Sequence, residues 1–170
     1  ENTQAIADEL VVVDTGSTDN TADSARAAGA RVISYAWRDD FAAAKNCALD
    51  AAQGEWILFL DADEYFSPRS LPRVREYIRK YQHQPQVVGF ICRLINIDSD
   101  RQDYFLNETC QARVFRNLPT LRYRGRVHEG LYDCVAGRHM EPAAALEIYH
   151  TGYSSSIFRA KSERNLRLLE

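Results

Sequence analysis

The chain has 170 residues, of which 45% are hydrophobic and 26% are charged, and its formal net charge is −3. This length suits one domain with a sizeable core, and the composition is that of an ordinary globular protein. The slight acidic excess argues against a protein built to bind nucleic acid, because such proteins usually carry a basic surplus.

The cysteines and the hydropathy exclude two further classes. The four cysteines lie far apart in the sequence, at Cys47, Cys92, Cys110 and Cys134. Without paired Cys or His spacing we expect no structural zinc site, and reduced thiols in a cytoplasmic protein are the simplest interpretation. No apolar run approaches the roughly 18 residues that a bilayer-spanning helix needs, so we expect no membrane span.

The first 97 residues alternate between apolar runs and helical patterns. In chain order, the expected elements are a strand at 10–13, a helix at 21–28, a strand at 31–35, a helix at 41–53, a strand at 56–60, a helix at 71–81 and a strand at 87–97. The strands are unbroken apolar runs rather than alternating ones. Such runs are typical of a parallel sheet with helices on both faces, so we predict an α/β fold with a Rossmann-like, mostly parallel sheet.

The pattern becomes irregular after residue 98. Short strand-like pieces at 109–116, 121–127 and 146–151 are joined by loops, and 156–170 is polar and helical. We therefore expect one domain over 1–152 with an irregular, mixed C-terminal part. A helical tail or linker follows at 153–170.

Two of the expected strands end in aspartates, Asp14 and Asp61. Ligands of open α/β sheets bind beyond the carboxyl ends of the strands, so both residues are candidates for one site. Asp61 and Asp63 can converge on one hard cation, since Mg²⁺ and Mn²⁺ favour carboxylate oxygens completed by water and phosphate. An acidic turn is the simpler alternative. A phosphatase of the haloacid-dehalogenase type carries its Asp-x-Asp on the first strand, whereas this strand is the third.

Asp14 also opens the tetrapeptide Asp-Thr-Gly-Ser, the local signature of an aspartic protease. That enzyme needs an all-β barrel and a second Asp-Thr-Gly, or a homodimer, because two such aspartates share a proton. This chain has one copy between helical segments. The protease is therefore only a remote alternative.

Lys45 falls in the middle of the apolar stripe of the helix expected at 41–53. Lysines are rarely buried without a partner. Either the side chain snorkels to the surface, or it reaches an anion such as a diphosphate at the strand ends.

Three stretches of the chain together resemble the catalytic domain of glycosyltransferase family 2, which has the GT-A fold. The matching segments are Glu-Leu-Val-Val-Val-Asp-Thr-Gly-Ser-Thr-Asp-Asn-Thr at 9–21, Phe-Ala-Ala-Ala-Lys-Asn-Cys-Ala-Leu at 41–49 and Gly-Glu-Trp-Ile-Leu-Phe-Leu-Asp-Ala-Asp-Glu at 54–64. Weaker matches lie at 124–130 and 149–153. These later pieces look like the bacterial branch in which a helical repeat domain often follows the transferase.

The resemblance implies a hexosyltransferase-type enzyme that uses a nucleotide-diphosphate sugar, with a UDP-sugar favoured. It implies dependence on Mn²⁺ or Mg²⁺, an inverting mechanism, and a glycan, lipid or peptide as the acceptor. A non-catalytic nucleotide- or sugar-binding fragment of the same fold is the alternative.

The resemblance also implies roles for single residues. Asp14 would contact the nucleotide base or ribose, and Asp61 would lie near the ribose and the metal. Asp63 would ligate the metal directly, and His150 matches the late histidine that often completes metal binding in this fold. Lys45 stands where the family often has Arg and would contact the diphosphate.

Inverting members of the family need a carboxylate that takes the proton of the acceptor. Glu129 is the candidate, because it lies in the Gly-flanked, Arg-rich segment Arg-Gly-Arg-Val-His-Glu-Gly at 124–130. Asp103 and Glu108 are the alternatives. The family's domain starts with a strand that carries an Asn-Glu pair, and we expect this chain to begin after that strand.

Overall fold

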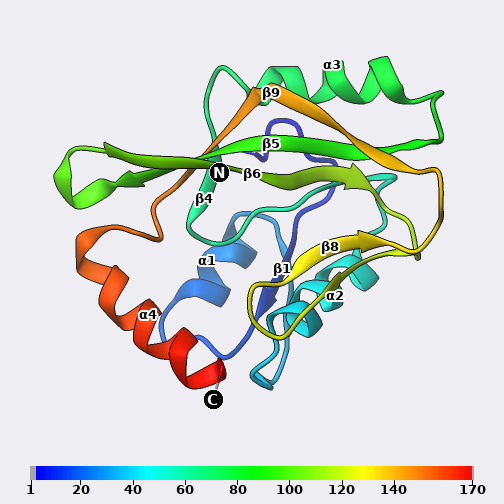
Figure 1. The fold of residues 1–170 in the computed structure, drawn as a ribbon. Coiled ribbons are helices and arrows are strands. Elements are labelled where there is room, and N and C mark those ends of the chain that lie inside the picture. The colour runs from blue at the N-terminus through cyan, green and yellow to red at the C-terminus, as the bar shows by residue number, and fades with distance from the viewer. Residues whose placement is uncertain (1–2, 170) are drawn as a thin grey trace. The chain divides into compact units, whose positions relative to one another are not determined.

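The computed structural model describes residues 3–169 and has an α/β fold (Figure 1). These residues form two compact units. The first comprises Thr3–Ile57 and Asn117–Ala136, and the second comprises Leu58–Arg116 and residues 137–169. The fold class predicted from the sequence is confirmed.

The first unit contains the parallel strands β1 (Val11–Asp14) and β2 (Arg31–Ser34), with helix α1 (Thr21–Ala27) between them in sequence. Helix α1 packs against β2. Within residues 3–169, β1 pairs with β2 alone, and its four residues are half-buried. The apolar run thus predicted the strand correctly, although its residues are less buried than expected.

Helix α2 (Phe41–Ala51) packs against β1 and against β7 (Leu121–Arg124). The helix begins after Asp40, whose side chain accepts a hydrogen bond from the backbone N–H of Ala43 at 2.8 Å, as a good N-cap does. Asn46 joins the helix to β7, because its amide bonds both the N–H and the C=O of Tyr123, at 2.9 and 3.0 Å. Strand β7 pairs antiparallel with β8 (Gly130–Asp133), a strand that the sequence did not predict.

The second unit is built on a five-stranded sheet. Its order is β3 (Trp56–Leu58), β6 (Tyr104–Arg116), β5 (Val87–Asp98), β9 (His139–His150) and β4 (Glu64–Phe66), and the last residue of β3, Leu58, opens the unit. Strands β5 and β9 are parallel, whereas β5 with β6 and β4 with β9 are antiparallel.

The sheet is therefore mixed, and the predicted mostly parallel sheet is not what the structure has. Strands β5 and β6 form a long hairpin through the short 3₁₀ turn η1 (Ser99–Arg101), after which Gln102 and Asp103 adopt left-handed φ values of 55° and 56°. An unbroken apolar run marks a strand that is covered on both faces. It does not report the direction of the neighbouring strands, which is why the antiparallel pairing of β5 with β6 was not predicted.

Helix α3 (Leu71–Tyr81) packs against β9, as Figure 1 shows, and the rings of Tyr77 and Tyr81 lie 5.4 and 5.5 Å from that of Phe90. Helix α4 (Ser155–Leu169) follows β9. Both helices confirm the expected helical segments. The most completely buried large side chains of this unit form its core, namely Phe66, Val74, Phe90, Phe115, Leu146 and Ile148.

Candidate functional site

The segment Asp61-Ala62-Asp63 lies between β3 and β4 in the second unit, and backbone hydrogen bonds fix it at both ends. The N–H of Glu64 donates to the carbonyl of Asp61 at 2.9 Å, which closes a tight turn. The carbonyl of Asp63 accepts from the N–H and the hydroxyl of Thr151, at 3.0 and 3.2 Å. The carboxylate of Asp63 is thereby held beside the end of β9.

Arg113 of β6 anchors the same turn from the interior. It donates from Nε and Nη2 to the two carboxylate oxygens of Glu64, both at 2.7 Å, and from Nη2 to Oδ2 of Asp61 at 3.0 Å. The side chains of Arg113 and Glu64 are only 7% and 2% exposed. A buried bidentate pair fixes the orientation of both side chains and also pairs their charges. Glu64 and Arg113 therefore support the turn from the interior of the unit.

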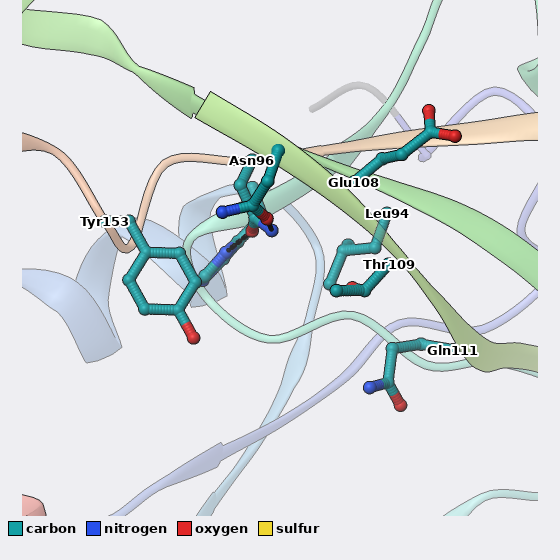
Figure 2. Close-up of a pocket in the computed structure, with 8 residues that line it drawn as sticks. Leu94, Asn96, Glu108, Thr109, Gln111 and Tyr153 are labelled. Carbon is teal, nitrogen blue, oxygen red and sulfur yellow. Dashed lines mark hydrogen bonds between the residues drawn. The ribbon is translucent and has the colours of Figure 1, made fainter. Parts of the chain in front are cut away.

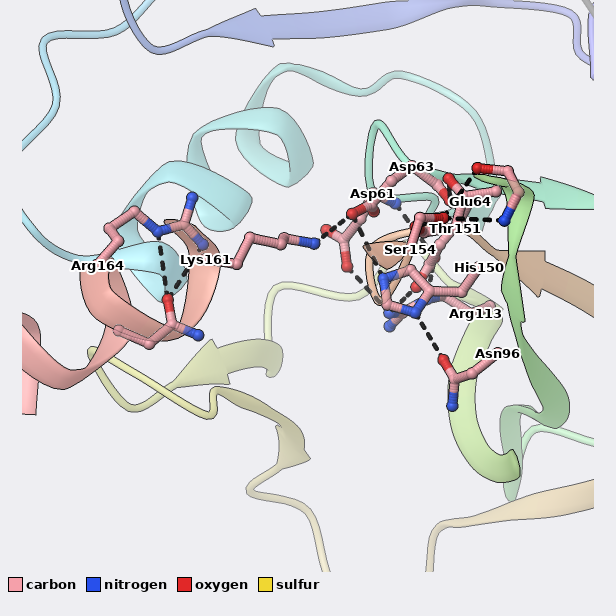
Figure 3. Close-up of polar contacts among 12 residues, drawn as sticks. Asp61, Asp63, Glu64, Asn96, Arg113, His150, Thr151, Ser154, Lys161 and Arg164 are labelled. Carbon is pink, nitrogen blue, oxygen red and sulfur yellow. Dashed lines mark hydrogen bonds and ion pairs between the residues drawn. The ribbon is translucent and has the colours of Figure 1, made fainter. Parts of the chain in front are cut away.

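His150 and Lys161 converge on the carboxylate of Asp63, as Figure 3 shows. Nε2 of His150 lies 3.4 Å from Oδ2 of Asp63, and the ammonium group of Lys161 on α4 donates to the same oxygen. Burial of Asp63 works to raise the pKa of its carboxyl group. The hydrogen bonds from His150 and Lys161 outweigh burial, however, and hold that pKa well below its usual range.

Asn96 orients the ring of His150. Its side chain is buried, its Nδ2 donates to Oδ1 of Asn107 at 2.6 Å, and its Oδ1 accepts from Nδ1 of His150 at 2.6 Å. Nδ1 of His150 is thus held by Asn96, and Nε2 is the ring nitrogen that faces Asp63.

The register of the sheet explains this alignment. Glu64, His150, Asn96 and Asn107 are opposite one another on β4, β9, β5 and β6, so the four side chains share one face. A row of polar groups thus crosses the sheet. Glu64 is one end of this row, and Asp63 is the residue before Glu64 in the sequence.

The donor set of Asp63 and His150 suits a divalent cation. Oδ2 of Asp63 and Nε2 of His150 lie 3.4 Å apart, and a carboxylate and a neutral imidazole are both ligands that divalent metals accept in proteins. Gly152 packs directly against this point, because a β-carbon there would clash with Asp63 Oδ2, His150 Nε2 and Lys161 Nζ. Within residues 3–169, no group of three or more His, Cys, Asp or Glu side chains converges to hold a metal. A cation here would take the rest of its ligands from water and phosphate, as Mg²⁺ usually does.

A cavity of about 510 Å³ adjoins His150 on the same face of the sheet (Figure 2). Its walls are mostly amide, hydroxyl and aromatic groups, from Leu94, Asn96, Asn107, Glu108, Thr109, Gln111, His150 and Tyr153. The ring of Tyr153 stands edge-on to that of His150, at 5.1 Å between centroids. Such groups suit a polyhydroxylated ligand better than a phosphate, for which a cation would be needed.

Glu108, an alternative for the catalytic base, lies at the edge of this cavity and points away from Gln111 and Tyr153 in Figure 2. It lies opposite Ile95, one residue out of step with the polar row, and its carboxylate is bound by Arg93 at 2.6 Å.

The first unit holds the three other residues singled out from the sequence. Asp14 ends β1, and its carboxylate accepts from the backbone N–H groups of Ser17 and Gly16 at 2.9 and 3.3 Å. Hydrogen bonds from the side chain and backbone of Ser17 lower the pKa of this carboxyl group. Lys45 and Glu129 form an ion pair of 2.7 Å, and their side chains are 11% and 14% exposed.

The turn before Glu129 makes this pair possible. Gly125 has a φ of 99°, a conformation that favours glycine, and His128 has a φ of 58°. The chain therefore turns sharply between β7 and β8 and presents Glu129 to α2. The ammonium group of Lys45 also lies 5.2 Å from the centre of the ring of Tyr123. The structure thus pairs Lys45 with Glu129, and both predicted roles remain predictions.

The structure brings Asp63 together with His150 and pairs Asp61 with Arg113, and the roles expected for these residues at a metal remain predictions. Asn96, Arg113 and Lys161 were not predicted from the sequence as parts of this site. The apolar run around Asn96 was a usable signal, because a lone Asn in a buried strand needs a polar partner.

No helix among residues 3–169 is long and apolar enough to span a membrane.

Known proteins place these observations in context. The chain is 34% identical to a TPR repeat-containing protein of Synechococcus elongatus, over 96% of this chain and 41% of that protein. It is 28% identical to the SPbeta prophage-derived glycosyltransferase SunS of Bacillus subtilis, over 95% of this chain and 38% of that protein. The chain therefore spans about two fifths of the length of these curated relatives.

Solved structures give a weaker likeness. Glucosyl-3-phosphoglycerate synthase of Mycobacterium tuberculosis, in complex with phosphoglyceric acid, is 26% identical with a TM-score of 0.39, over 54% of this chain and 32% of that one. Residues 1–349 of S. aureus TarS, in complex with UDP, are 26% identical with a TM-score of 0.38, over 53% of this chain and 26% of that one.

The family model described as "Glycosyl transferase family 2" matches residues 3–143, which is most of the chain. This match leaves no place for an aspartic protease, and the α/β fold around Asp14 agrees, because that enzyme needs an all-β barrel. The chain belongs to glycosyl transferase family 2.

Proposed function

We propose that this chain transfers a sugar from a nucleotide-diphosphate sugar, a UDP-sugar by preference, to a glycan, lipid or peptide acceptor. The observation that carries the proposal is the facing pair of Asp63 and His150, in a chain that belongs to a family of glycosyl transferases. The name of the Bacillus subtilis relative, a glycosyltransferase, supports the same reaction class.

Asp63 and His150 would hold a Mn²⁺ or Mg²⁺ ion in this proposal. Bound there, the ion would supply positive charge to the departing diphosphate. Asn96 keeps the Nε2 lone pair of His150 directed at the ion, and Arg113 holds the turn on which Asp63 lies. Asp61, bound to Arg113, would lie near the ribose and the ion.

The sugar would occupy the cavity beside His150. Its amide and hydroxyl groups can exchange hydrogen bonds with sugar hydroxyls, and the ring of Tyr153, whose residue is 46% exposed, offers an apolar surface. Asp14 at the end of β1 would contact the nucleotide. Lys45 would contact the diphosphate after it has left its ion pair with Glu129.

The transfer would be inverting, with Glu129 as the base that takes the acceptor's proton. Its ion pair with Lys45 supports a different, structural role, so the base needs a direct test. Glu129→Gln should keep donor binding and lower transfer about 100-fold or more. If this variant transfers sugar at the parent rate, the base is elsewhere, and Asp103 and Glu108 become the next residues to replace.

The proposal is tested by incubating the chain with UDP-sugars and following release of UDP, with Mn²⁺, with Mg²⁺ and with a chelator. We expect release that depends on the metal. Tight binding of the UDP-sugar without release or transfer would instead identify a non-catalytic binding domain. We also propose a helical repeat domain downstream, because the Synechococcus relative is named for its TPR repeats.

A further inference from the structure

Lys161 contacts Asp63 beside His150, although a metal site needs no lysine in that position. Its ammonium group donates to Oδ2 of Asp63, the oxygen that also faces Nε2 of His150. A positive charge from α4 therefore already lies where the two proposed ligands meet.

The space around this charge is confined. A β-carbon on Gly152 would meet Lys161 Nζ, His150 Nε2 and Asp63 Oδ2 as its three nearest atoms, so these three groups share one small volume. Gly152 itself is buried, whereas the side chains of Asp63 and Lys161 are 25% and 32% exposed. The lysine can therefore leave toward solvent, and an ion can enter by the same route.

We propose that the ammonium group of Lys161 and a divalent cation are alternative occupants of this position. The inference rests on the proposed metal site, and it adds Lys161 as an intramolecular competitor that was not expected from the sequence. The ammonium group of Lys161 and a divalent cation cannot occupy this small volume beside Oδ2 of Asp63 together, because the two positive charges repel each other at contact. Displacement of Lys161 then frees its amine and removes one of the contacts that hold α4.

Competition has a quantitative consequence. The affinity measured for the ion is the intrinsic affinity reduced by the fraction of molecules in which Lys161 has left Asp63. The coupling is reciprocal, so an ion that displaces the lysine must also expose it.

The first test measures the affinity of Mn²⁺ alone by titration calorimetry, for the parent chain and for Lys161→Met. Methionine keeps most of the length of the side chain and removes the charge. We expect Mn²⁺ to bind Lys161→Met about 10-fold more tightly or better. Arg159→Met is the matched control, since Arg159 lies on the same helix, is 91% exposed in its side chain and pairs with Glu163. This control should bind Mn²⁺ as the parent does.

The second test uses the parent chain and does not depend on how the variant folds. An amine-reactive acylating reagent is applied with and without Mn²⁺, and labelling is read at each lysine by mass spectrometry. We expect Mn²⁺ to speed labelling of Lys161 and to leave Lys80, an exposed lysine on α3, unchanged.

Unchanged or weaker Mn²⁺ binding by Lys161→Met would overturn the inference, as would labelling of Lys161 that does not respond to Mn²⁺. Absence of Mn²⁺ binding in both proteins would overturn it as well. Neither test contains a nucleotide sugar. A chain that passes both but transfers no sugar would therefore refute the proposed function and leave the competition standing.

Discussion

Replacement of Arg113 by methionine should destabilise the second unit strongly. The guanidinium donates two hydrogen bonds of 2.7 Å to Glu64, whose side chain is 2% exposed, so the variant leaves a buried carboxylate without its counter-ion. Breaking a buried pair from one side costs roughly 3–5 kcal/mol. We expect about 3 kcal/mol, because the N–H of Asp61 still donates to Glu64 at 3.2 Å.

Urea denaturation followed by circular dichroism measures this loss. With a denaturant slope of about 2 kcal/mol/M, the midpoint should fall by roughly 1.5 M. Arg93→Met is the matched control, because Arg93 also binds two carboxylates, Glu108 and Glu147, but its side chain is 35% exposed. It should cost less than about 1 kcal/mol. If Arg113→Met costs no more than Arg93→Met, the buried pair does not support the turn in the way we describe.

Three further variants and reactions follow from the structure. Lys45→Met should lower the free energy of unfolding by about 2–3 kcal/mol in urea, since it breaks a nearly buried ion pair, and an unchanged midpoint would argue against that pair. Iodoacetamide at pH 8.5 should label exposed Cys110 and spare Cys92, because burial raises the pKa of the Cys92 thiol to about 12; rapid labelling of Cys92 in the folded chain would contradict this. Asn96→Ala should weaken Mn²⁺ binding about 10- to 100-fold by calorimetry, because His150 loses the partner that orients it, and equal affinity would remove Asn96 from the site.

The Cys92 shift also predicts a pH dependence of stability. The folded-state pKa is raised, so the unfolded chain loses the thiol proton first. This contribution to stability is therefore fully present below about pH 9 and declines as the pH rises toward 12. Thermal unfolding of Cys92→Ala and the parent between pH 7 and 10 would show the difference, and parallel curves would contradict it.

Local patterns in the sequence were enough for most elements. The apolar runs predicted β1, β2, β3 and β5, and the helical patterns at 41–53 and 71–81 predicted α2 and α3. Strand β4 was missed because it has only three residues and begins within the acidic motif. The charged residues before Phe66 gave no sign that Phe66 is buried. The hairpin of β5 and β6 was missed because burial on both faces conceals strand direction.

The candidate site, too, could be predicted from the sequence only in part. The sequence singled out Asp63 because carboxylates after a buried strand suit a cation, and it singled out His150 through the family resemblance. Lys161 lies 98 residues from Asp63, and Glu129 lies far from Lys45 in sequence, so only the fold brings each pair together. A spacing rule within one helix or strand cannot report such a contact. The sequence left open whether Lys45, in the apolar stripe of α2, reaches the surface or an anion, and it could not show that Glu129 lies beside it.

The binding of UDP with and without Mn²⁺, by the parent chain and by Asp63→Ala, tests the central claim most directly. Asp23→Ala, which removes a carboxylate that is 81% exposed on α1, serves as the matched control. We predict that the parent and the control bind UDP more tightly when Mn²⁺ is present, and that Asp63→Ala remains folded but loses this dependence. Equal, Mn²⁺-dependent affinity for UDP in Asp63→Ala would show that Asp63 does not hold the cation.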